Sequence, residues 1–380
     1  MINAVDLFSK LRTQLEKKRP FVAYRKPGMF QAKALLQKDI HSHLAEDLSE
    51  SGFVFAPFDI RSKAYLIPSD ESEIFDFQFK GDPTDEEEQS FPGFDFEMME
   101  EDQKKHELLV QKGIDKIKES DLKKVVLSRS ERVPVHDPDP IRIFKNLLEK
   151  YSSAMVYLWY HPDTGIWLGA TPETLLKAER NRFQTMALAG TQLYKGETDV
   201  EWQTKEVEEQ LFVTDYILDS LEKLPAIEKI QASRPYSAKA GNLLHICTDI
   251  SGHIKDKESL KDLIEALHPT PAVCGLPKEP ALKFIQENED HSREFYSGYL
   301  GELNFKFEQK RNSNKKNQEN QQFASISKQT DLYVNLRCMK LKEGNARIYV
   351  GGGITKDSNA ADEWMETVNK SQTMKAVLVK

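Results

Sequence analysis

The chain has 380 residues, of which 39% are hydrophobic and 30% charged, enough for one large or two ordinary domains with a sizeable core. No apolar run approaches the ~18–20 residues that a membrane-spanning helix needs, and a formal net charge of −8 argues against a broad nucleic-acid surface. The 3 cysteines form neither a zinc pattern nor an even-numbered disulfide set. We therefore expect a cytoplasmic globular protein with free thiols and with neither a membrane nor a nucleic acid as partner.

The first 95 residues carry the weakest sequence signals of the chain. An amphipathic helix is predicted over residues 1–20 and short strands over 52–56 and 64–67. The acidic stretch Asp85–Glu88 follows and is typical of a solvated loop. We expect residues 1–95 to be a variable N-terminal part of the same domain and residues 96–380 to hold its core.

Helix and strand patterns alternate without regular βαβ units from residue 97 onward. Helices are predicted over 97–118, 200–224, 256–267 and 280–289, and strands over 122–129, 154–160, 165–168 and 183–188. Mixed strands and helices of this kind favour an α+β domain built in layers over a doubly wound sheet. The polar tract 308–330 is low in complexity and predicts a loose excursion of a hairpin.

The last fifty residues contain the most suggestive constellation. Strands are predicted over 332–340 and 346–354, and the second ends in the run Gly351–Gly353, which suits unusual torsions or close approach to a ligand. A helix follows in which Glu363, Glu366 and Lys370 share one face. Together with Arg337, these groups could converge on an anionic, metal-bound ligand. The alternative is a strand end, a glycine turn and a solvated helix face.

Further candidates for chemistry lie upstream. Glu206 and Glu209 form a second Glu-x-x-Glu pair, which suits Mg²⁺ because that ion takes one or two protein carboxylates and completes its shell with water and substrate oxygens. Exposed helices also carry such pairs without a metal. Lys124 heads an apolar strand and is either a general base or a charged strand edge. Glu173 is either a general acid or an acidic helix start, and His245 is more often a core histidine than a catalytic one.

Seven short motifs give these residues a common context, because they occur in the order seen in chorismate-utilising enzymes. They are Lys124–Arg129, Gly169–Glu173, Leu188–Thr191, Lys205–Glu209, Leu267–Ala272, Gly351–Ile354 and Glu363–Thr367. The resemblance covers roughly residues 100–380 and is strongest to isochorismate synthases of menaquinone and siderophore biosynthesis. It implies a chorismate-utilising-enzyme fold with two layered β-sheets and helices packed outside.

The resemblance also implies a role for each matched residue. Lys124 would be the base that activates water for attack at C2 of chorismate, and Glu173 the acid that protonates the departing C4 hydroxyl. Mg²⁺ would be bound by Glu209 and Glu366, with Glu206 and Glu363 nearby. The remaining substrate-binding positions would be Gly190, Thr191, His245, Arg337, Gly351, Gly353 and Lys370.

Two positions distinguish members of the resembled family. A lysine is present at position 124 and absent at position 189, which is Ala189, and this combination favours water as the nucleophile over ammonia or a lysine. An isochorismate synthase without a glutaminase subunit is therefore expected. A salicylate synthase, which goes on to eliminate pyruvate, and a non-catalytic binding subunit remain as alternatives. Gln210 departs from the pattern, since many relatives have histidine there.

Overall fold

The computed structural model describes residues 2–79, 96–240, 243–255, 260–309 and 325–378. The helices in these ranges are α1 (Ala4–Glu16), α2 (Phe96–Glu119), α3 (Pro140–Lys150), α4 (Thr204–Glu222), α5 (Leu260–Leu267), α6 (Lys278–Asn288) and α7 (Ala360–Lys375). The acidic stretch Asp85–Glu88, predicted to be a loop, and residues 310–324 of the polar tract lie outside the described residues.

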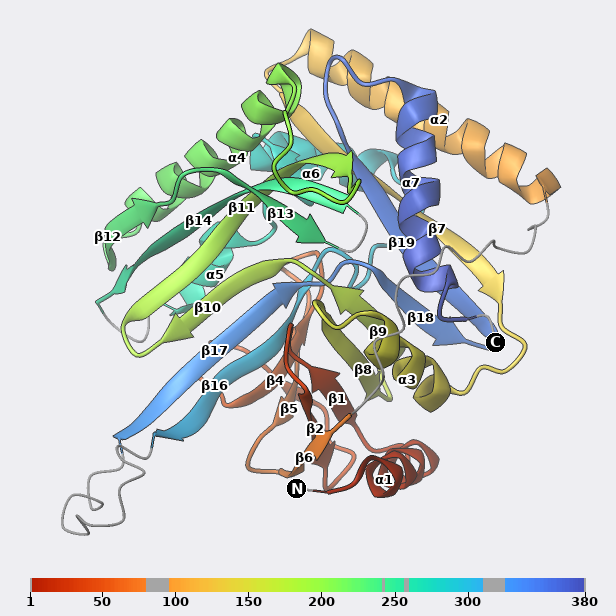
Figure 1. Ribbon diagram of the computed structural model, residues 1–380, viewed down its shortest axis with the longest axis vertical. Helices are drawn as coiled ribbons and strands as arrows, with labels where there is room; N and C mark the ends of the chain where they lie inside the picture. Colours follow the sequence, from red (N-terminus) through yellow and green to blue (C-terminus); the bar gives the residue numbers. More distant parts are fainter. Residues whose placement is uncertain (1, 80–95, 241–242, 256–259, 310–324, 379–380) are drawn as a thin grey trace.

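The strands form two large antiparallel sheets (Figure 1). The nine-stranded sheet runs, from edge to edge, through β15 (Gly275–Leu276), β7 (Lys124–Pro134), β19 (Asn345–Ile354), β18 (Cys338–Lys342), β9 (Gly165–Thr171), β8 (Met155–His161), β1 (Phe21–Arg25), β2 (Gln31–Gln37) and β6 (Ser72–Gln78). The ten-stranded sheet holds β12 (Ile227–Ala232), β14 (Leu243–Ile254), β11 (Arg182–Leu193), β10 (Thr174–Glu179), β17 (Ser325–Val334), β16 (Tyr299–Gln309), β4 (Gly52–Ala56), β5 (Tyr65–Pro68) and β3 (His43–Leu44), with β13 (Tyr236–Ala240) paired to β14.

The two sheets pack against each other through an aromatic cluster. Phe55 of β4 stacks on Phe295 with ring centroids 4.3 Å apart and an interplanar angle of 9°. Trp159 and Trp167, both fully buried, approach Phe55 from the other sheet. Large rings remove much apolar surface from water and add specific ring–ring contacts, so this cluster fixes how the two layers are placed.

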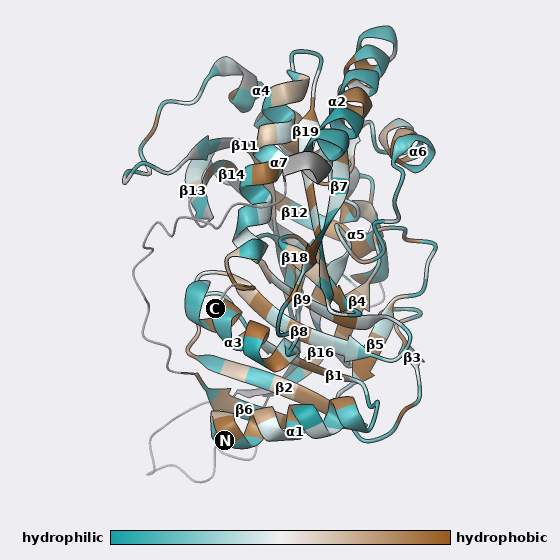
Figure 2. Ribbon diagram, turned by 90° about the vertical axis from the view of Figure 1, so that its right-hand side faces the viewer, coloured by the Kyte–Doolittle hydropathy of each residue, from teal (hydrophilic) through white to brown (hydrophobic). Residues whose placement is uncertain are grey.

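Helices cover the outer faces of both sheets. Apolar residues of α1, α3 and the end of α7 pack on the nine-stranded sheet, and those of α4 and α5 on the ten-stranded sheet. Helices α2 and α6 pack beside β7 and β15. In Figure 2, hydrophobic and hydrophilic residues alternate along α1 and α2, as expected for helices that bury one face. The predicted fold class, two layered sheets with helices outside, is confirmed.

Two predictions about single elements are wrong. The strand expected over 332–340 is two strands, because β17 ends at Val334 and β18 begins at Cys338, and these belong to different sheets. The tract 308–330 was expected to be loose throughout, yet residues 325–330 belong to β17 and pair with β16. In both cases pairing with other strands decided the outcome, and local composition does not report that pairing.

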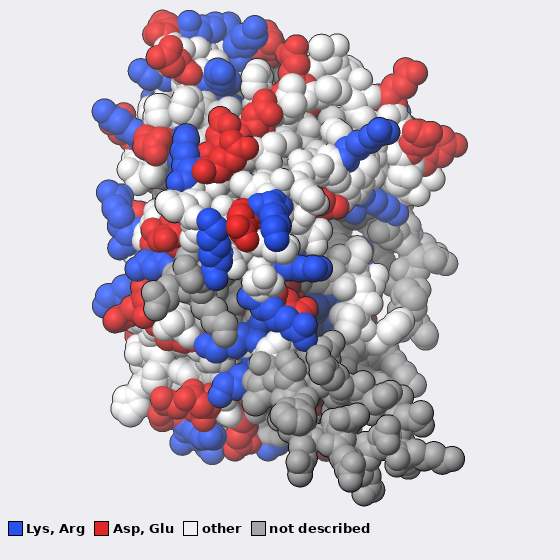
Figure 3. All heavy atoms as spheres, turned by 90° about the vertical axis from the view of Figure 1, so that its left-hand side faces the viewer, with Lys and Arg blue, Asp and Glu red and all other residues white. Residues whose placement is uncertain are grey.

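Charged side chains are unevenly distributed over one face of the molecule. Figure 3 shows acidic and basic side chains interspersed over the upper part of one face, with Lys and Arg gathered across its middle. Within the described residues, no helix is long and apolar enough to cross a membrane.

Candidate active site

All the site residues predicted from the sequence line one cleft. The cleft has an open volume of about 1100 Å³ including its mouth. Its walls include Lys124, Glu173, Gly190, Thr191, Glu206, Glu209, His245, Arg337, Gly351, Gly353, Glu363, Glu366 and Lys370. These residues come from both sheets and from α4 and α7, so only the folded chain brings them together.

The glycine run lies on β19, next to β7. Gly353 is paired with Val126, close to Lys124 at the start of β7. A Cβ atom on Gly353 would lie 2.8 Å from Lys124 Cε, and one on Gly352 would lie 3.2 Å from Glu363 Oε2. None of the three glycines has a positive φ, so glycine is needed here because it allows close approach of neighbouring groups, and not because of an unusual backbone torsion.

Helix α7 presents its carboxylates to the cleft from its first turns. Asn359 caps the helix by accepting hydrogen bonds from the backbone N–H groups of Ala361 and Asp362. This start places Glu363 and Glu366 next to the glycine run. The Ser358 hydroxyl donates to Glu363 Oε1 at 2.6 Å, which fixes the orientation of that carboxylate.

Lys370, one turn further along α7, closes this side of the site. Its ammonium group pairs with Glu366 and donates to the Gly351 carbonyl at 2.9 Å. One lysine therefore connects the helix that carries the carboxylates to the glycine strand.

Helix α4 supplies the second carboxylate pair from the opposite wall. Glu209 Oε1 accepts a hydrogen bond from Lys124 Nζ at 2.6 Å. A bulge in β11 gives Gly190 a φ of +69° and brings it against Glu206, where an added Cβ would lie 3.0 Å from Glu206 Cβ. Gln210 points elsewhere: it is buried and donates to Thr248 Oγ1 at 2.7 Å, which anchors α4 to β14.

Arg337 lies in the three-residue connection that carries the chain from β17 to β18. Its φ of +46° is unusual for a residue with a side chain and marks the crossing between the two sheets. The guanidinium makes a long contact, 3.5 Å, with the Lys370 carbonyl, and burial lowers the pKa of this side chain from its usual value. Splitting the predicted strand is therefore what brings Arg337 to the cleft.

The surroundings of Glu173 change the acidity of its carboxyl group. It follows β9 and Pro172 and is 5% exposed. Burial raises the pKa of Glu173 to about 7, while the positive charges of Lys124, Lys370 and Arg337 act in the opposite direction. A carboxyl group with this pKa is partly protonated at neutral pH and can donate a proton.

His245 is held on β14 as a neutral ring. Its Nδ1 lies 2.8 Å from the Gly190 carbonyl oxygen and 3.3 Å from Thr191 Oγ1. Burial lowers the pKa of His245 to about 4, so the imidazole is uncharged at neutral pH. Nδ1–H donates to the Gly190 carbonyl in this arrangement, which leaves Nε2 as the acceptor.

The carboxylates of the cleft fit a hard divalent cation. Glu206 Oε2 is buried and has no hydrogen-bond partner among the described residues. No three of the four glutamates bring their oxygens within 4.8 Å of one another, so in the described chain they form an open arrangement rather than a closed cage. Mg²⁺ usually keeps several water or substrate oxygens in its shell, and an open set of carboxylates provides room for them.

Two tyrosines of the cleft were missed by the sequence analysis. Tyr349 and Tyr296 both line it, and their rings stack with centroids 5.7 Å apart. Tyr349, Gly351 and Gly353 are alternate residues of β19, so strand periodicity places them on one face and could have identified Tyr349. Tyr296 lies outside the regular elements and gave no such signal.

Comparison with known proteins agrees with this geometry. A model of the chorismate binding enzyme family matches residues 72–309, and a second model with the same description matches residues 323–376. The chain belongs to the chorismate-binding enzymes. The first match alone covers more than half of the chain.

Named relatives of this chorismate-binding enzyme carry out more than one reaction. This chain is 26% identical over 286 residues to the salicylate biosynthesis isochorismate synthase of Pseudomonas aeruginosa, and the match covers 73% of this chain and 55% of that protein. It is 27% identical over 284 residues to anthranilate synthase component 1 of Saccharolobus solfataricus, covering 72% and 62%. The chain thus spans between about half and two thirds of the length of these relatives.

A solved structure supports the fold over nearly the whole chain. The menaquinone-specific isochorismate synthase MenF of Escherichia coli superposes with a TM-score of 0.72 at 20% identity, covering 95% of this chain and 89% of that one. At this identity the likeness establishes the fold and leaves the reaction to be argued from the site.

Proposed function

We propose that this chorismate-binding enzyme is an isochorismate synthase that isomerises chorismate with Mg²⁺ bound in the cleft. The observation that carries the proposal is a lysine and a protonatable carboxyl group in one cleft. Lys124 and Glu173 both line it, both are less than 10% exposed, and the Glu173 pKa is about 7. Addition of water with loss of a hydroxyl group needs one base and one acid, and this pair supplies them.

The reaction balances with water as both reactant and product. Lys124 accepts a proton from water as the oxygen forms a bond to C2 of chorismate. The ring double bonds shift, the bond between C4 and its hydroxyl oxygen breaks, and Glu173 gives its proton to the departing oxygen. One water enters and one leaves, so the product is an isomer of the substrate.

The remaining residues hold the two carboxylates of the substrate. Glu209 and Glu366 would bind Mg²⁺, with Glu206 and Glu363 close by, and the ion would supply positive charge at the ring carboxylate. Arg337 and the backbone around Gly353 are proposed to bind the pyruvyl carboxylate, since a guanidinium fork and exposed amides suit a carboxylate. Lys370, Gly190, Thr191 and Gly351 complete the anion pocket, and the neutral His245 lines the ring site.

Charge in the cleft supports the need for the cation. The four glutamates of α4 and α7 outnumber the basic side chains of the cleft, which are Lys124, Arg337 and Lys370. A substrate with two negative charges would meet a negative site unless a divalent ion is present. Positioned acid and base groups typically contribute ~10²–10⁴-fold each, and fixed orientation adds to this.

The nucleophile separates this proposal from its relatives. Ala189 leaves no lysine beside Gly190 to attack the ring, and Lys124 is placed to activate water instead. A reaction that uses water needs no ammonia-supplying glutaminase subunit.

Product analysis tests the proposal directly. The purified protein is incubated with chorismate and Mg²⁺, with an EDTA control, and the products are separated by chromatography. Isochorismate alone, dependent on Mg²⁺, is the expected result. Salicylate with equimolar pyruvate would assign a salicylate synthase, and anthranilate on addition of ammonium would refute the role of Lys124. Chorismate binding without any product would assign a binding subunit.

A further inference from the structure

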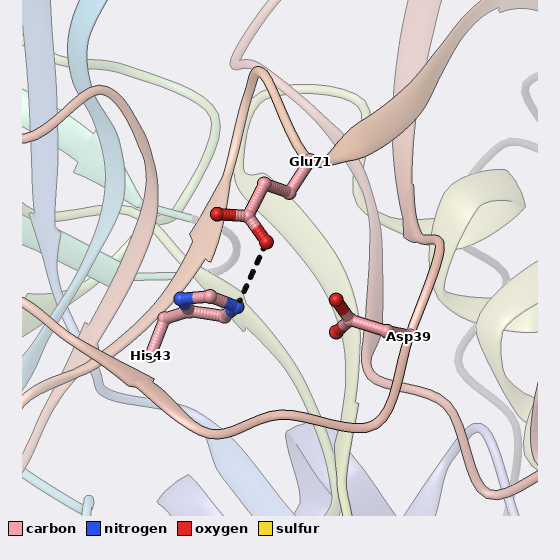
Figure 4. Close-up of side chains that lie close together, drawn as sticks. All are labelled: Asp39, His43 and Glu71. Atoms are coloured by element: carbon pink, nitrogen blue, oxygen red, sulfur yellow. Dashed lines mark ion pairs between the residues drawn. The ribbon is translucent and has the colours of Figure 1, made fainter.

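A second group of ligand-type side chains lies where the edges of the two sheets meet. Asp39 follows β2, His43 opens β3, and Glu71 immediately precedes β6 (Figure 4). Strand β6 is the edge of the nine-stranded sheet and β3 the edge of the ten-stranded sheet. The group therefore sits on the two segments that carry the chain between the layers, and none of its members lines the active-site cleft.

The three side chains face one another. One ligand atom from each lies within 4.8 Å of the other two, and within the described ranges no other three His, Cys, Asp or Glu residues meet this condition. Figure 4 shows the Asp39 carboxylate turned toward the imidazole of His43 and toward Glu71.

The imidazole nitrogen at the centre of the group is unusual. His43 Nε2 lies 3.3 Å from Glu71 Oε2, yet it is a buried atom without a partner in hydrogen-bond geometry among the described residues. A buried ring nitrogen normally has a hydrogen bond, because leaving it unpaired costs free energy. This nitrogen lies within ion-pair distance of Glu71 but has no hydrogen-bond partner in the described chain, which leaves it available as a metal ligand.

The Asp39 carboxylate is already held in position by neighbouring residues. Its Oδ1 accepts hydrogen bonds from Gln37 Nε2 at 2.8 Å and from the backbone N–H of His41 at 3.1 Å. The Gln37 side chain is buried, so its hydrogen bond to Asp39 is shielded from water. Outer groups that orient a ligand in this way are typical of metal sites.

We propose that Asp39, His43 and Glu71 bind one divalent transition-metal ion of the Zn²⁺ type, with water completing its shell. The imidazole decides the class of ion, because nitrogen ligands suit Zn²⁺ and its neighbours, whereas Mg²⁺ prefers oxygen alone. The protein would then carry two kinds of metal site, an oxygen-only site in the cleft and a mixed site at the sheet edges.

Such an ion would join the two layers. The backbone N–H of Lys38 already donates to the Glu71 carbonyl at 3.0 Å, which brings the two crossover segments together. A metal bound across Asp39, His43 and Glu71 would stabilise the folded chain, because a ligand that binds only the folded state raises the melting temperature.

Zinc binding to the metal-free protein tests the proposal. Calorimetric titration with ZnCl₂ in excess Mg²⁺ and without chorismate is expected to give one bound ion per chain and a higher melting temperature. His43→Gln and Glu71→Gln are expected to weaken binding by ~100-fold or more, since even groups that only orient a ligand are worth ~10–100-fold. Glu71 is half exposed, so its variant is expected to fold. His136→Gln removes an exposed histidine elsewhere and serves as the matched control.

Three results would overturn the proposal. The first is zinc binding no stronger than a background that His136→Gln shows as well. The second is equal zinc binding by the wild type, His43→Gln and Glu71→Gln. The third is loss of zinc binding in Glu366→Gln or its displacement by Mg²⁺, which would place the ion in the cleft. The titration uses no substrate, so its outcome is independent of whether the enzyme makes isochorismate.

Discussion

Replacing Glu173 by glutamine is expected to change activity and stability in opposite directions. Burial raises the Glu173 pKa from 4.5 to about 7. The folded protein therefore holds this proton at a higher pH than the unfolded chain does, and the associated stability is complete below pH 4.5 and is lost as the pH rises through 7. A shift of roughly 2.5 units at 1.36 kcal/mol each corresponds to a loss of about 3 kcal/mol in the wild type. Glutamine cannot ionise, so the variant does not incur this loss.

Urea unfolding of both proteins between pH 4.5 and 9 measures the effect. The unfolding free energy of Glu173→Gln relative to wild type is expected to rise by about 3 kcal/mol over this range, with most of the change between pH 5 and 7. Turnover of the variant is expected to fall by ~10²–10⁴-fold, because its amide cannot donate the proton. In the wild type, activity should decline as the pH rises above 7. A difference in unfolding free energy that is independent of pH would show that Glu173 is ionised in the folded protein and would refute its role as acid.

Three further substitutions probe the base and the metal ligands. Lys124→Ala is expected to abolish turnover with little loss of Mg²⁺-dependent chorismate binding; undiminished turnover would exclude Lys124 as the base. Glu366→Gln is expected to weaken Mg²⁺ binding by about tenfold or more, measured by the Mg²⁺ concentration that gives half-maximal activity; an unchanged requirement would exclude α7 as a metal helix. Ser358→Ala removes the hydrogen bond to Glu363 and is expected to raise the same Mg²⁺ requirement ~10-fold with kcat kept at saturating Mg²⁺; an unchanged requirement would show that Ser358 does not orient the ligand.

The sequence predicted the candidate site better than it predicted the strands around it. Helical spacing placed Glu363, Glu366 and Lys370 on one face, and the order of the motifs indicated which other residues belong to the same site. In the structure all three line one cleft. These features are local in the chain, with periods that depend only on helix and strand geometry. Such patterns can therefore be read from the sequence without knowing how the elements pack against one another.

Features that depend on distant pairing were not accessible in the same way. The break between Val334 and Cys338 occurs inside a stretch rich in β-branched, aromatic and aliphatic residues, because the chain changes sheets there and both sides remain buried. Strand β14, 12 residues long, was not predicted, although it pairs with β11, β12 and β13. Its place is set by three partner strands, and no local propensity encodes such partners.

The Lys124–Glu209 contact links the proposed base to the proposed Mg²⁺ site. Glu209 Oε1 accepts a hydrogen bond from the Lys124 ammonium, and the same carboxylate is a proposed Mg²⁺ ligand. Glu209 would therefore contact the proposed base and help to bind the proposed ion at the same time. One carboxylate would thus hold Lys124 in place and also serve the metal site. Placing the carboxylate on α4 and the lysine on β7, in different layers, makes this coupling a property of the assembled cleft.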